Sequence, residues 1–223
     1  DGGRFVVFDK SNTQAIKGNA VYALAAARNG SLWAGTSGGL LRYKDGTFTR
    51  YGEADGLVEE NIQSLFEARD GTLWIGTLGS GVMAYKDGRF SAAPGQPLLK
   101  QGRVQAISQG RDGTLWFAIN GGTSPGLYCF RDNTTARYTT ANGLSSDRVN
   151  AVMEDSLGTV WVGTAQGLDR LQEGRFIRFR GRGGSVDTAV RALLESQAGE
   201  LWIGTETDGI HRISSYQSLS HYP

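Results

Sequence analysis

Short runs of alternating apolar and polar residues recur along the whole chain, and a tight polar turn follows each run. The runs occupy residues 21–27, 62–68, 104–109, 149–154 and 190–195. Each turn leads into a second apolar run that contains a tryptophan. Alternation with a period of two on both sides of a short turn predicts a strand, a hairpin and a second strand.

The tryptophans mark an internal repeat. All five lie in one recurring phrase, for example residues 72–77 (TLWIGT), and successive tryptophans are 41, 42, 45 and 41 residues apart. A glycine-containing loop then leads to a third apolar run, and a second tight turn leads to a fourth run around Phe48, Phe90 or Phe176. Four short antiparallel strands per repeat form the unit of a propeller blade, whereas a helical solenoid of similar period needs 3.6-residue patterning, which this sequence lacks.

The repeat predicts an all-β fold, namely a five-bladed β-propeller of four-stranded antiparallel blades that forms a single domain over residues 1–223. The repeats cover residues 19–60, 61–102, 103–147, 148–188 and 189–223, the last together with residues 1–8. Residues 3–8 match the fourth strand of other repeats, and the fifth repeat shows no clear fourth strand of its own. We therefore expect the N-terminal strand to pair with the last blade and close the ring, because closure removes open sheet edges. The alternative is five repeats from a larger ring.

Composition excludes several classes of function. Lys and Arg total 23 against 22 Asp and Glu, so the chain has no net field that favours nucleic acid. The 33 glycines belong in turns, because a collagen period is absent and there are only 4 prolines. One cysteine cannot form an internal disulfide, and two histidines are too few for a histidine-based metal site unless carboxylates supply the other ligands. We therefore expect no metal and no cofactor. No run is apolar enough to insert in a membrane, and the N-terminus has no signal-peptide pattern.

Three stretches resemble the two-component regulator propeller repeat. They are residues 70–77 (DGTLWIGT), residues 81–90 (GVMAYKDGRF) and residues 142–149 (NGLSSDRV). The third repeat departs from the pattern, because Ala118-Ile119 replaces Gly-Thr and residues 120–125 form an inserted loop; the fifth repeat lacks the final Asp-Gly turn.

The resemblance implies an extracytoplasmic sensor region of bacterial hybrid histidine kinases, often tied to sensing of polysaccharide breakdown products. It therefore implies a periplasmic or extracellular location and a role in signal transduction. Sensors of this family usually have more blades, and this chain contains no kinase, transmembrane or DNA-binding segment.

The first strand of each propeller blade lines the axis, and the loops that enter it are long here, for example residues 52–61 and 139–148. We expect the ligand on this side, because long loops on a rigid scaffold commonly carry function. Aligning the first strands places hydrogen-bonding side chains one residue after, or one residue before, the first apolar position. The candidate ligand-binding residues are Tyr22, Asn61, Gln63, Arg103, Gln105, Arg148, Asn150 and Arg191. Two arginines from adjacent blades suit a carboxylate or a hydroxyl-rich ligand. The alternative is that these groups only line a water-filled channel.

Other conspicuous residues have structural interpretations. A tryptophan at the same place in every repeat predicts packing between blades, and the glycine two residues later predicts close approach of neighbouring sheets. The Asp-Gly pairs fit hairpin turns and lack the spacing of a calcium loop. Cys129 is interpreted as a small buried hydrophobe, and His211 as a structural histidine.

The function predicted from these patterns is a non-enzymatic recognition module with no catalytic residues, which binds a small polar ligand such as an oligosaccharide at the axis mouth. One alternative is a scaffold that docks a protein partner or a second copy. Another is a lyase or hydrolase that uses His211 with an acidic neighbour.

Overall fold

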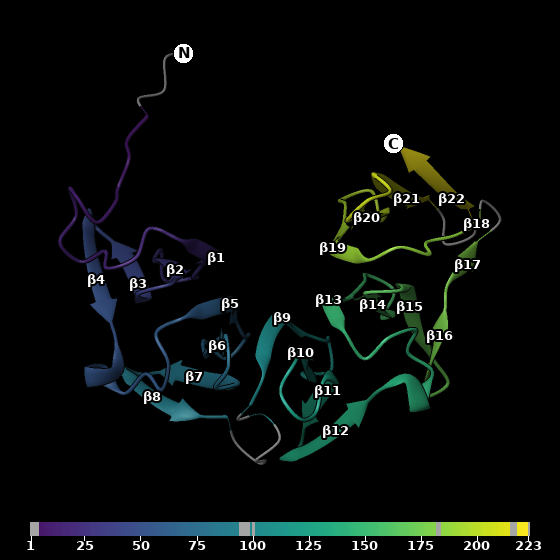
Figure 1. The fold of residues 1–223 in the computed structure, drawn as a ribbon, viewed down its shortest axis with the longest axis horizontal. Helices are drawn as coiled ribbons and strands as arrows, with labels where there is room; N and C mark the ends of the chain where they lie inside the picture. The colour runs from purple at the N-terminus through teal and green to yellow at the C-terminus, as the bar shows by residue number, and fades with distance from the viewer. Residues whose placement is uncertain (1–4, 94–98, 100, 182–183, 215–217, 223) are drawn as a thin grey trace. The chain divides into compact units, whose positions relative to one another are not determined.

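The computed structural model describes residues 5–93, 99, 101–181, 184–214 and 218–222, the last five in backbone only. Contacts within the chain divide it into two compact units, residues 1–93 and 94–223, and each is described by itself. Strands provide nearly all of the regular structure in the described residues (Figure 1). The all-β prediction is therefore confirmed.

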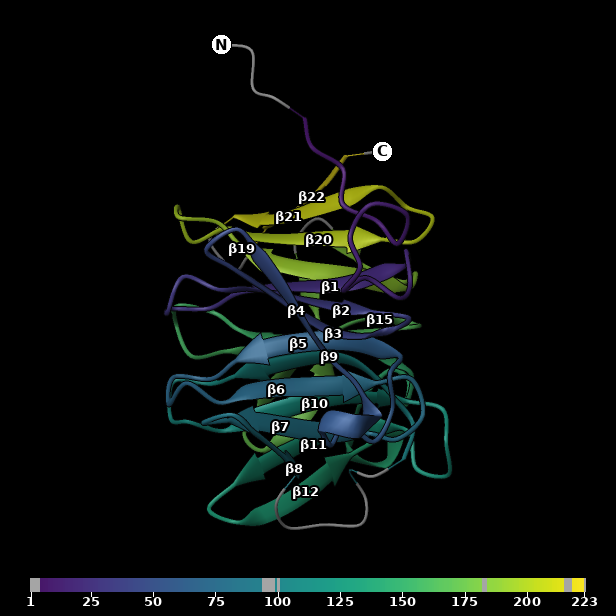
Figure 2. The same ribbon diagram turned by 90° about the vertical axis from the view of Figure 1, so that its left-hand side faces the viewer.

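The first unit holds two four-stranded antiparallel sheets, and in each the strands lie in chain order. Figure 2 shows β5 to β8 side by side in that order. The first sheet contains β1 (Val21–Ala26), β2 (Leu32–Thr36), β3 (Gly39–Lys44) and β4 (Thr47–Tyr51). The second sheet contains β5 (Ile62–Glu67), β6 (Leu73–Thr77), β7 (Val82–Lys86) and β8 (Arg89–Ala92), and the 3-10 turn η1 (Glu53–Asp55) precedes it.

The second unit holds three more four-stranded sheets of the same connectivity. The third sheet contains β9 (Arg103–Gln109), β10 (Leu115–Asn120), β11 (Gly126–Arg131) and β12 (Thr134–Tyr138). The fourth contains β13 (Val149–Glu154), β14 (Val160–Thr164), β15 (Gly167–Gln172) and β16 (Arg175–Arg178), preceded by η3 (Thr140–Asn142). A two-stranded ribbon, β17 (Arg180–Gly181) and β18 (Gly184–Ser185), precedes the fifth sheet. The fifth contains β19 (Val190–Glu195), β20 (Leu201–Thr205), β21 (Ile210–Ser214) and β22 (Ser218–Tyr222).

The fifth sheet corrects one prediction. Its fourth strand is β22, which pairs antiparallel with β21 and occupies the place that we expected the N-terminal strand to take. Residues 5–8 form no strand, and the ring of Phe8 instead lies 5.1 Å from that of Phe48 on β4. The segment around β22 has neither the Asp-Gly turn that precedes β4 and β8 nor the phenylalanine of β4, β8 and β16, which is why the repeat pattern missed it. Residues 1–4 lie outside the described part of the chain.

The Asp-Gly pairs form the predicted hairpin turns. Asp45 and Gly46 have φ values of 50° and 80°, and Asp87 and Gly88 have values of 49° and 80°. Two successive positive φ values define a type I′ turn, which joins two antiparallel strands with little splay. The aspartates are therefore explained by turn geometry.

Each pair of neighbouring sheets within a unit encloses an apolar core. Four of the five tryptophans are at most 6% exposed, which confirms their predicted packing role, and Trp202 is half-buried. The glycine two residues after the tryptophan allows close contact between sheets: a Cβ on Gly35 would lie 2.7 Å from Ile62 Cγ2, and one on Gly163 would lie 2.5 Å from Val190 Cγ1. Both distances are too short for real atoms, so the close-approach prediction is confirmed at these two positions.

The first sheet differs from the others at its first apolar position. Val21 is 54% exposed, whereas the four equivalent residues are fully buried; they are Ile62, Val104, Val149 and Val190.

The structure confirms the predicted four-stranded antiparallel sheets. The closed ring of five blades and the single domain stay predictions.

Candidate functional site

A β-bulge lies at the same point of the first strand in all five sheets. In β1, for example, Val21 pairs with Thr36 and Ala23 pairs with Gly35, so Tyr22 has no partner of its own on β2. The five residues at this position, called the bulge residues below, are Tyr22, Gln63, Gln105, Asn150 and Arg191. Each was predicted as a site residue. A bulge re-aims the side chain of its extra residue and is frequent next to functional sites.

The two bulge residues of the first unit differ in whether their side chains are already hydrogen-bonded within the protein. Gln63 Nε2 donates a hydrogen bond to Asn61 Oδ1 at 2.5 Å, so these two predicted site residues bind each other. Tyr22 is 47% exposed, and its hydroxyl has no hydrogen-bond partner in the described part of the chain. Of the three predicted residues in this unit, Tyr22 alone has no side-chain hydrogen bond among the described residues.

Asn150 joins strands in the second unit. Its side chain is 6% exposed, and its Nδ2 donates to the carbonyl oxygen of Val190 at 2.9 Å, which connects the fourth sheet to the fifth. Its Oδ1 accepts a hydrogen bond from Asn120 Nδ2 at 3.4 Å, which connects the fourth sheet to the third. Asn150 therefore orders the site more than it offers atoms to a ligand.

Arg191 is paired with an acid. Its guanidinium lies 2.6 Å from Glu206 Oε1, and both side chains are about half exposed, at 47% and 49%. An ion pair at such exposure contributes little to stability, commonly below about 1 kcal/mol, so it can open for a ligand at small cost.

Three predicted residues of the second unit have unpaired side chains. Arg103 is the first residue of β9, Gln105 is the bulge residue of that strand, and Arg148 directly precedes β13. Arg103 and Arg148 are exposed, and none of the three side chains has a hydrogen bond or an ion pair among the residues that the structure describes. A planar guanidinium presents donors that match a carboxylate, so Arg103 and Arg148 have the chemistry to bind one.

The sequence analysis missed a second set of residues beside the bulge residues. They follow the second strand or end it, four residues after each tryptophan, and they are Ser37, Leu78, Asn120, Ala165 and Glu206. Asn120 contacts Asn150, and Glu206 contacts Arg191, as described above. Their constant offset from the tryptophans is visible in the sequence, but these residues lie outside the first strands, where the site was expected.

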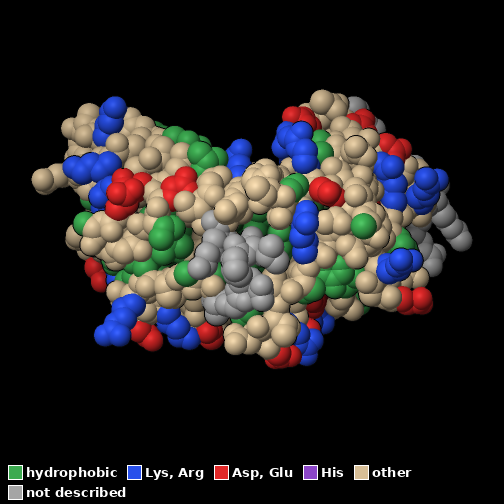
Figure 3. Space-filling view, turned by 60° about the horizontal axis from the view of Figure 1, so that its bottom comes forward, with side chains coloured by type: hydrophobic (Ala, Val, Ile, Leu, Met, Phe, Trp, Pro, Cys, Tyr) green, Lys and Arg blue, Asp and Glu red, His purple; other side chains and the backbone are tan. Residues whose placement is uncertain are grey.

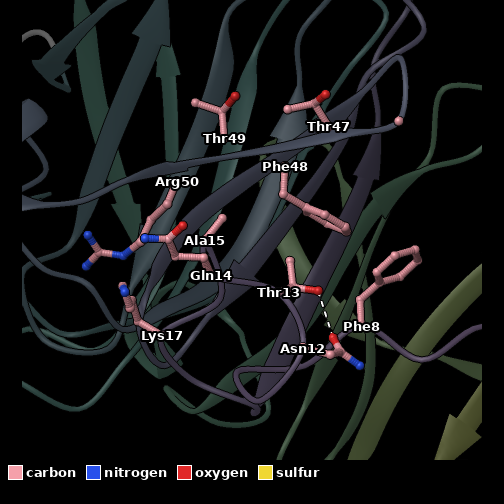
Figure 4. Close-up of a pocket in the computed structure, with 11 residues that line it drawn as sticks. Phe8, Asn12, Thr13, Gln14, Ala15, Lys17, Thr47, Phe48, Thr49 and Arg50 are labelled. Atoms are coloured by element: carbon pink, nitrogen blue, oxygen red, sulfur yellow. Dashed lines mark hydrogen bonds between the residues drawn. The ribbon is translucent and has the colours of Figure 1, made fainter.

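The structure also has a broad pocket in the first unit. It has a volume of about 780 Å³ and lies between the segment that precedes β1 and strand β4. Figure 4 shows Phe8 and Phe48 on one side of it and Lys17 and Arg50 on another. Arg50 Nη2 donates a hydrogen bond to Glu60 Oε1 at 2.5 Å. None of the predicted site residues lines this pocket.

His211 and Cys129 fit structural interpretations. His211 is 4% exposed, and its Nε2 lies 3.0 Å from Asp208 Oδ2, so it has an acidic neighbour that the sequence did not make evident. Cys129 is half-buried on β11 against the core of the third and fourth sheets, and burial raises the pKa of its thiol. A raised pKa leaves little thiolate at neutral pH, which argues against a nucleophile.

The surface is of mixed charge. Figure 3 shows basic and acidic side chains interspersed on the face in view. Within the described ranges, no three His, Cys, Asp or Glu residues are grouped so that they would hold a metal ion. No helix among these residues is long and apolar enough to cross a membrane.

Solved structures with similar folds define the class as a propeller-like all-β protein. An extracellular domain assigned to a hybrid two-component system of B. thetaiotaomicron matches with a TM-score of 0.72 and 21% identity, over 92% of this chain and 31% of that one. PorZ, a surface component of the type-IX secretion system of Porphyromonas gingivalis, matches with a TM-score of 0.70 and 16% identity, over 91% and 33%. Virginiamycin B lyase from Staphylococcus aureus matches with a TM-score of 0.68 and 17% identity, over 91% and 69%.

The sequence carries two-component regulator propeller repeats. The model of that repeat family matches residues 15–38, 56–79 and 143–166, which confirms the resemblance. No curated protein matches the chain. The chain spans about a third of the length of the first two structures, and identities of 16–21% relate it to all three by fold alone.

Proposed function

We propose that the protein is a non-enzymatic recognition module that binds a small polar ligand, such as an oligosaccharide, beside the bulge residues of the second unit. The observation that carries the proposal is that Arg103, Gln105 and Arg148 have side chains that are unpaired among the described residues. The first two lie on β9 and the third directly precedes β13, and these two strands contact each other. Unpaired polar side chains beside bulges are better explained by ligand binding than by stability, because they contribute no hydrogen bond to the fold.

The other predicted residues have supporting roles in this proposal. Asn150 holds strands of the second unit together, and Arg191 releases Glu206 when it binds the ligand. In the first unit, Tyr22, Asn61 and Gln63 stay candidates for ligand contacts within that unit. Extracytoplasmic sensing follows as part of the proposal from the propeller repeats and from the fold of the B. thetaiotaomicron domain.

Calorimetry with a panel of neutral and acidic oligosaccharides tests the proposal. A Gln105→Ala/Arg148→Ala double variant is expected to weaken binding of any ligand found by roughly tenfold or more, because about 1.4 kcal/mol corresponds to each factor of ten. A matched control, Gln197→Ala/Arg175→Ala, removes the same chemical groups from exposed positions on a turn and on β16. Equal affinities for the double variant and the wild type would remove the proposed site, and a protein that binds no member of the panel would favour the scaffold alternative.

An enzyme that uses His211 is the second candidate, favoured by the 3.0 Å contact between His211 Nε2 and Asp208 Oδ2 and by the fold shared with a lyase. An acid that orients a histidine is the arrangement a general base requires. The burial of His211 argues against direct contact with a substrate. If any oligosaccharide of the panel is cleaved, His211→Ala separates the two functions, because only the enzyme interpretation predicts loss of turnover.

A further inference from the structure

A second cavity of the first unit lies between its two sheets, at the end of the strands opposite the bulges. Its volume of about 240 Å³ is below the roughly 300–1,000 Å³ of pockets that hold drug-sized ligands, so it suits a smaller molecule. It lies beside the turns that follow β1, β5 and β7, whereas the bulge residues Tyr22 and Gln63 lie near the start of β1 and β5.

Strand pairing brings the walls of this cavity together. In the second sheet Glu67 pairs with Leu73, and Leu73 pairs with Tyr85, so these three side chains share one face of the sheet. In the first sheet Trp33 pairs with Arg42, and the Trp33 ring lies 5.3 Å from the Tyr85 ring. The two rows therefore face each other, with Arg42 on one wall of the cavity and Glu67 on the other.

Arg42 is held in place but keeps hydrogen-bond donors for a ligand. Its guanidinium carbon lies 5.6 Å from the centre of the Trp33 ring, and its Nε donates to Ser31 Oγ at 2.8 Å. Neither of its two Nη groups has a hydrogen bond or an acidic partner among the described residues, and neither is sealed from solvent. A guanidinium that is already fixed and has unused N–H groups is suited to bind a carboxylate.

Glu67 has one oxygen bound within the protein and one available. Its Oε1 accepts a hydrogen bond from the backbone nitrogen of Arg28 at 3.3 Å and lies 3.6 Å from Arg28 Nε. Its Oε2 has no partner among the described residues and is not sealed from solvent, although the side chain as a whole is only 14% exposed. An ionised carboxylate oxygen accepts hydrogen bonds only, so this atom favours a ligand that carries an ammonium group.

The other ionisable residues of the cavity alter this balance little. Lys86 Nζ is paired with Asp70 Oδ2 at 2.8 Å, and Asp87 lies in the exposed turn between β7 and β8. Burial is the main cause that raises the pKa of Tyr85 to about 12, so its hydroxyl is neutral at physiological pH and does not repel an acid.

The second unit uses the equivalent arginines differently. Arg170 and Arg212 take the place of Arg42 in the fourth and fifth sheets, where each pairs with the tryptophan of its sheet. Arg170 Nη2 donates a hydrogen bond to Gln172 Oε1 at 3.3 Å. Arg212 Nη1 lies 3.3 Å from Glu200 Oε1. The repeat therefore does not require an arginine with unpaired Nη groups at this position.

We propose that the cavity between the first two sheets binds a small amino acid in its zwitterionic form. The carboxylate of the ligand accepts hydrogen bonds from the Nη groups of Arg42, and its ammonium group donates to Glu67 Oε2. A simple carboxylate would leave Glu67 Oε2 without a partner, and a simple amine would leave Arg42 without one. The inference is independent of the proposed function, since none of the bulge residues lines this cavity.

NMR titration of the full chain with three matched probes tests this inference, followed through the indole N–H signal of Trp33. The probes are L-alanine, propionate, which lacks the amine, and ethylamine, which lacks the carboxylate. The wild type is expected to bind L-alanine at least roughly tenfold more tightly than either of the others, because each of those keeps only one of the two charged contacts.

Two variants separate the contacts. Arg42→Met keeps the approximate length of the side chain without the guanidinium and should weaken both L-alanine and propionate by roughly tenfold. Glu67→Gln keeps an acceptor for the backbone nitrogen of Arg28 and should weaken L-alanine by roughly fivefold or more. The same variant should bind propionate as well as the wild type does or more tightly, because a negative charge is removed, whereas a merely structural effect would weaken both probes.

Arg212→Met is the matched control, because it removes a guanidinium from over Trp202 in the second unit and should leave the affinity for L-alanine unchanged. Thermal unfolding of each variant identifies a loss of fold, and the nearly isosteric Glu67→Gln still tests the site if Arg42→Met does not fold. The inference is overturned if L-alanine leaves the Trp33 signal unchanged at millimolar concentrations or if propionate or ethylamine binds as tightly. Unchanged affinity for L-alanine in both variants, or equal weakening of L-alanine and propionate in Glu67→Gln, also overturns it.

Discussion

The third and fourth sheets have the same four strands, but different side chains hold their turns and loops. In the fourth sheet, Asp155 accepts a hydrogen bond from Trp161 Nε1 at 2.7 Å, and Asp169 accepts from the backbone nitrogen and hydroxyl of Ser145 at 2.8 and 2.5 Å. The equivalent residues of the third sheet are Gly110 and Tyr128.

The third sheet has no carboxylate at these two positions. Apolar packing and a hydrogen bond from the Tyr128 hydroxyl to the carbonyl oxygen of Ser124 take the place of the carboxylate contacts. Tyr128 is fully buried, Ile119 is 1% exposed, and Trp116 Nε1 is buried without a partner among the described residues. The same sheet supplies Arg103, Gln105 and Asn120 to the candidate site. The comparison teaches that the repeat can exchange its polar loop contacts for packing while it keeps the same four strands.

The largest expected effect concerns the glycine of the fourth sheet. Gly163→Ala places a Cβ 2.5 Å from Val190 Cγ1, and we expect it to lower the free energy of unfolding by about 2–3 kcal/mol. The third sheet already has an alanine, Ala118, at this position. Urea denaturation measures the loss.

Gly204→Ala is the matched control for this variant. A Cβ at Gly204 would meet nothing closer than Ala192 Cβ at 3.6 Å, so the substitution should be neutral or stabilise by up to about 1 kcal/mol. If Gly204→Ala lowers the free energy of unfolding as much as Gly163→Ala does, another sheet packs against Gly204 in solution. Close packing at this glycine would then not distinguish the fourth sheet from the fifth.

A second prediction concerns Asp155, which is 2% exposed. Besides Trp161 Nε1, its Oδ1 accepts from the backbone nitrogens of Leu157 and Thr159 at 2.9 and 2.8 Å. Asp155→Ala leaves these donors unpaired and should lower the free energy of unfolding by about 2 kcal/mol. Thermal unfolding followed by tryptophan fluorescence measures the change.

Asp112→Ala tests the corresponding turn of the third sheet. Asp112 Oδ1 accepts from the backbone nitrogen of Thr114 at 2.9 Å, but its side chain is 47% exposed, so water replaces the lost contact and the cost should stay below about 1 kcal/mol. Equal losses for the two variants would mean that burial does not distinguish the two turns.

The smallest expected effect is on the pH dependence of stability. Burial raises the pKa of Asp169 above its ordinary value, although hydrogen bonds from Ser145 oppose the shift. Between the ordinary and the raised pKa the folded protein binds more protons than the unfolded chain, so stability falls as pH rises through this window, by at most about 1.4 kcal/mol per pH unit. Asp169→Asn should remove this fall, as urea denaturation from pH 3.5 to 7 would show.

Asp112→Asn provides a control of opposite sign. The backbone hydrogen bond from Thr114 is the main cause that lowers the pKa of Asp112, so its contribution is lost as pH falls. The variant should therefore reduce the loss of stability at acid pH. An unchanged profile in Asp169→Asn would mean that water reaches this carboxyl in the folded state.

The repeat made most of the fold predictable. Alternating runs located the strands, the Asp-Gly pairs located the turns at Asp45 and Asp87, and the recurring tryptophans located the core between sheets. These features are local, so each can be recognised within one repeat. Strand β22 was missed because backbone pairing with β21 requires no particular side chain.

The site was predictable only in part. The alignment found the five bulge residues, but a hydrophobic pattern does not reveal the shift in register that distinguishes them. Contacts between repeats, such as Asn150 with the carbonyl of Val190 and Asn120 with Asn150, depend on the distance between sheets, which the sequence does not encode locally. For this reason, the sequence could not tell which predicted residues are already paired.

The recurring bulge has a consequence for diversification. A bulge residue lies outside the pairwise ladder, so its side chain can be exchanged without shifting the strands on either side. The five sheets already contain four residue types at this position: tyrosine, glutamine, asparagine and arginine. Asn150 is the exception, because it bonds to both neighbouring sheets. A combinatorial library confined to the other four codons would therefore vary what each sheet presents while leaving the scaffold constant.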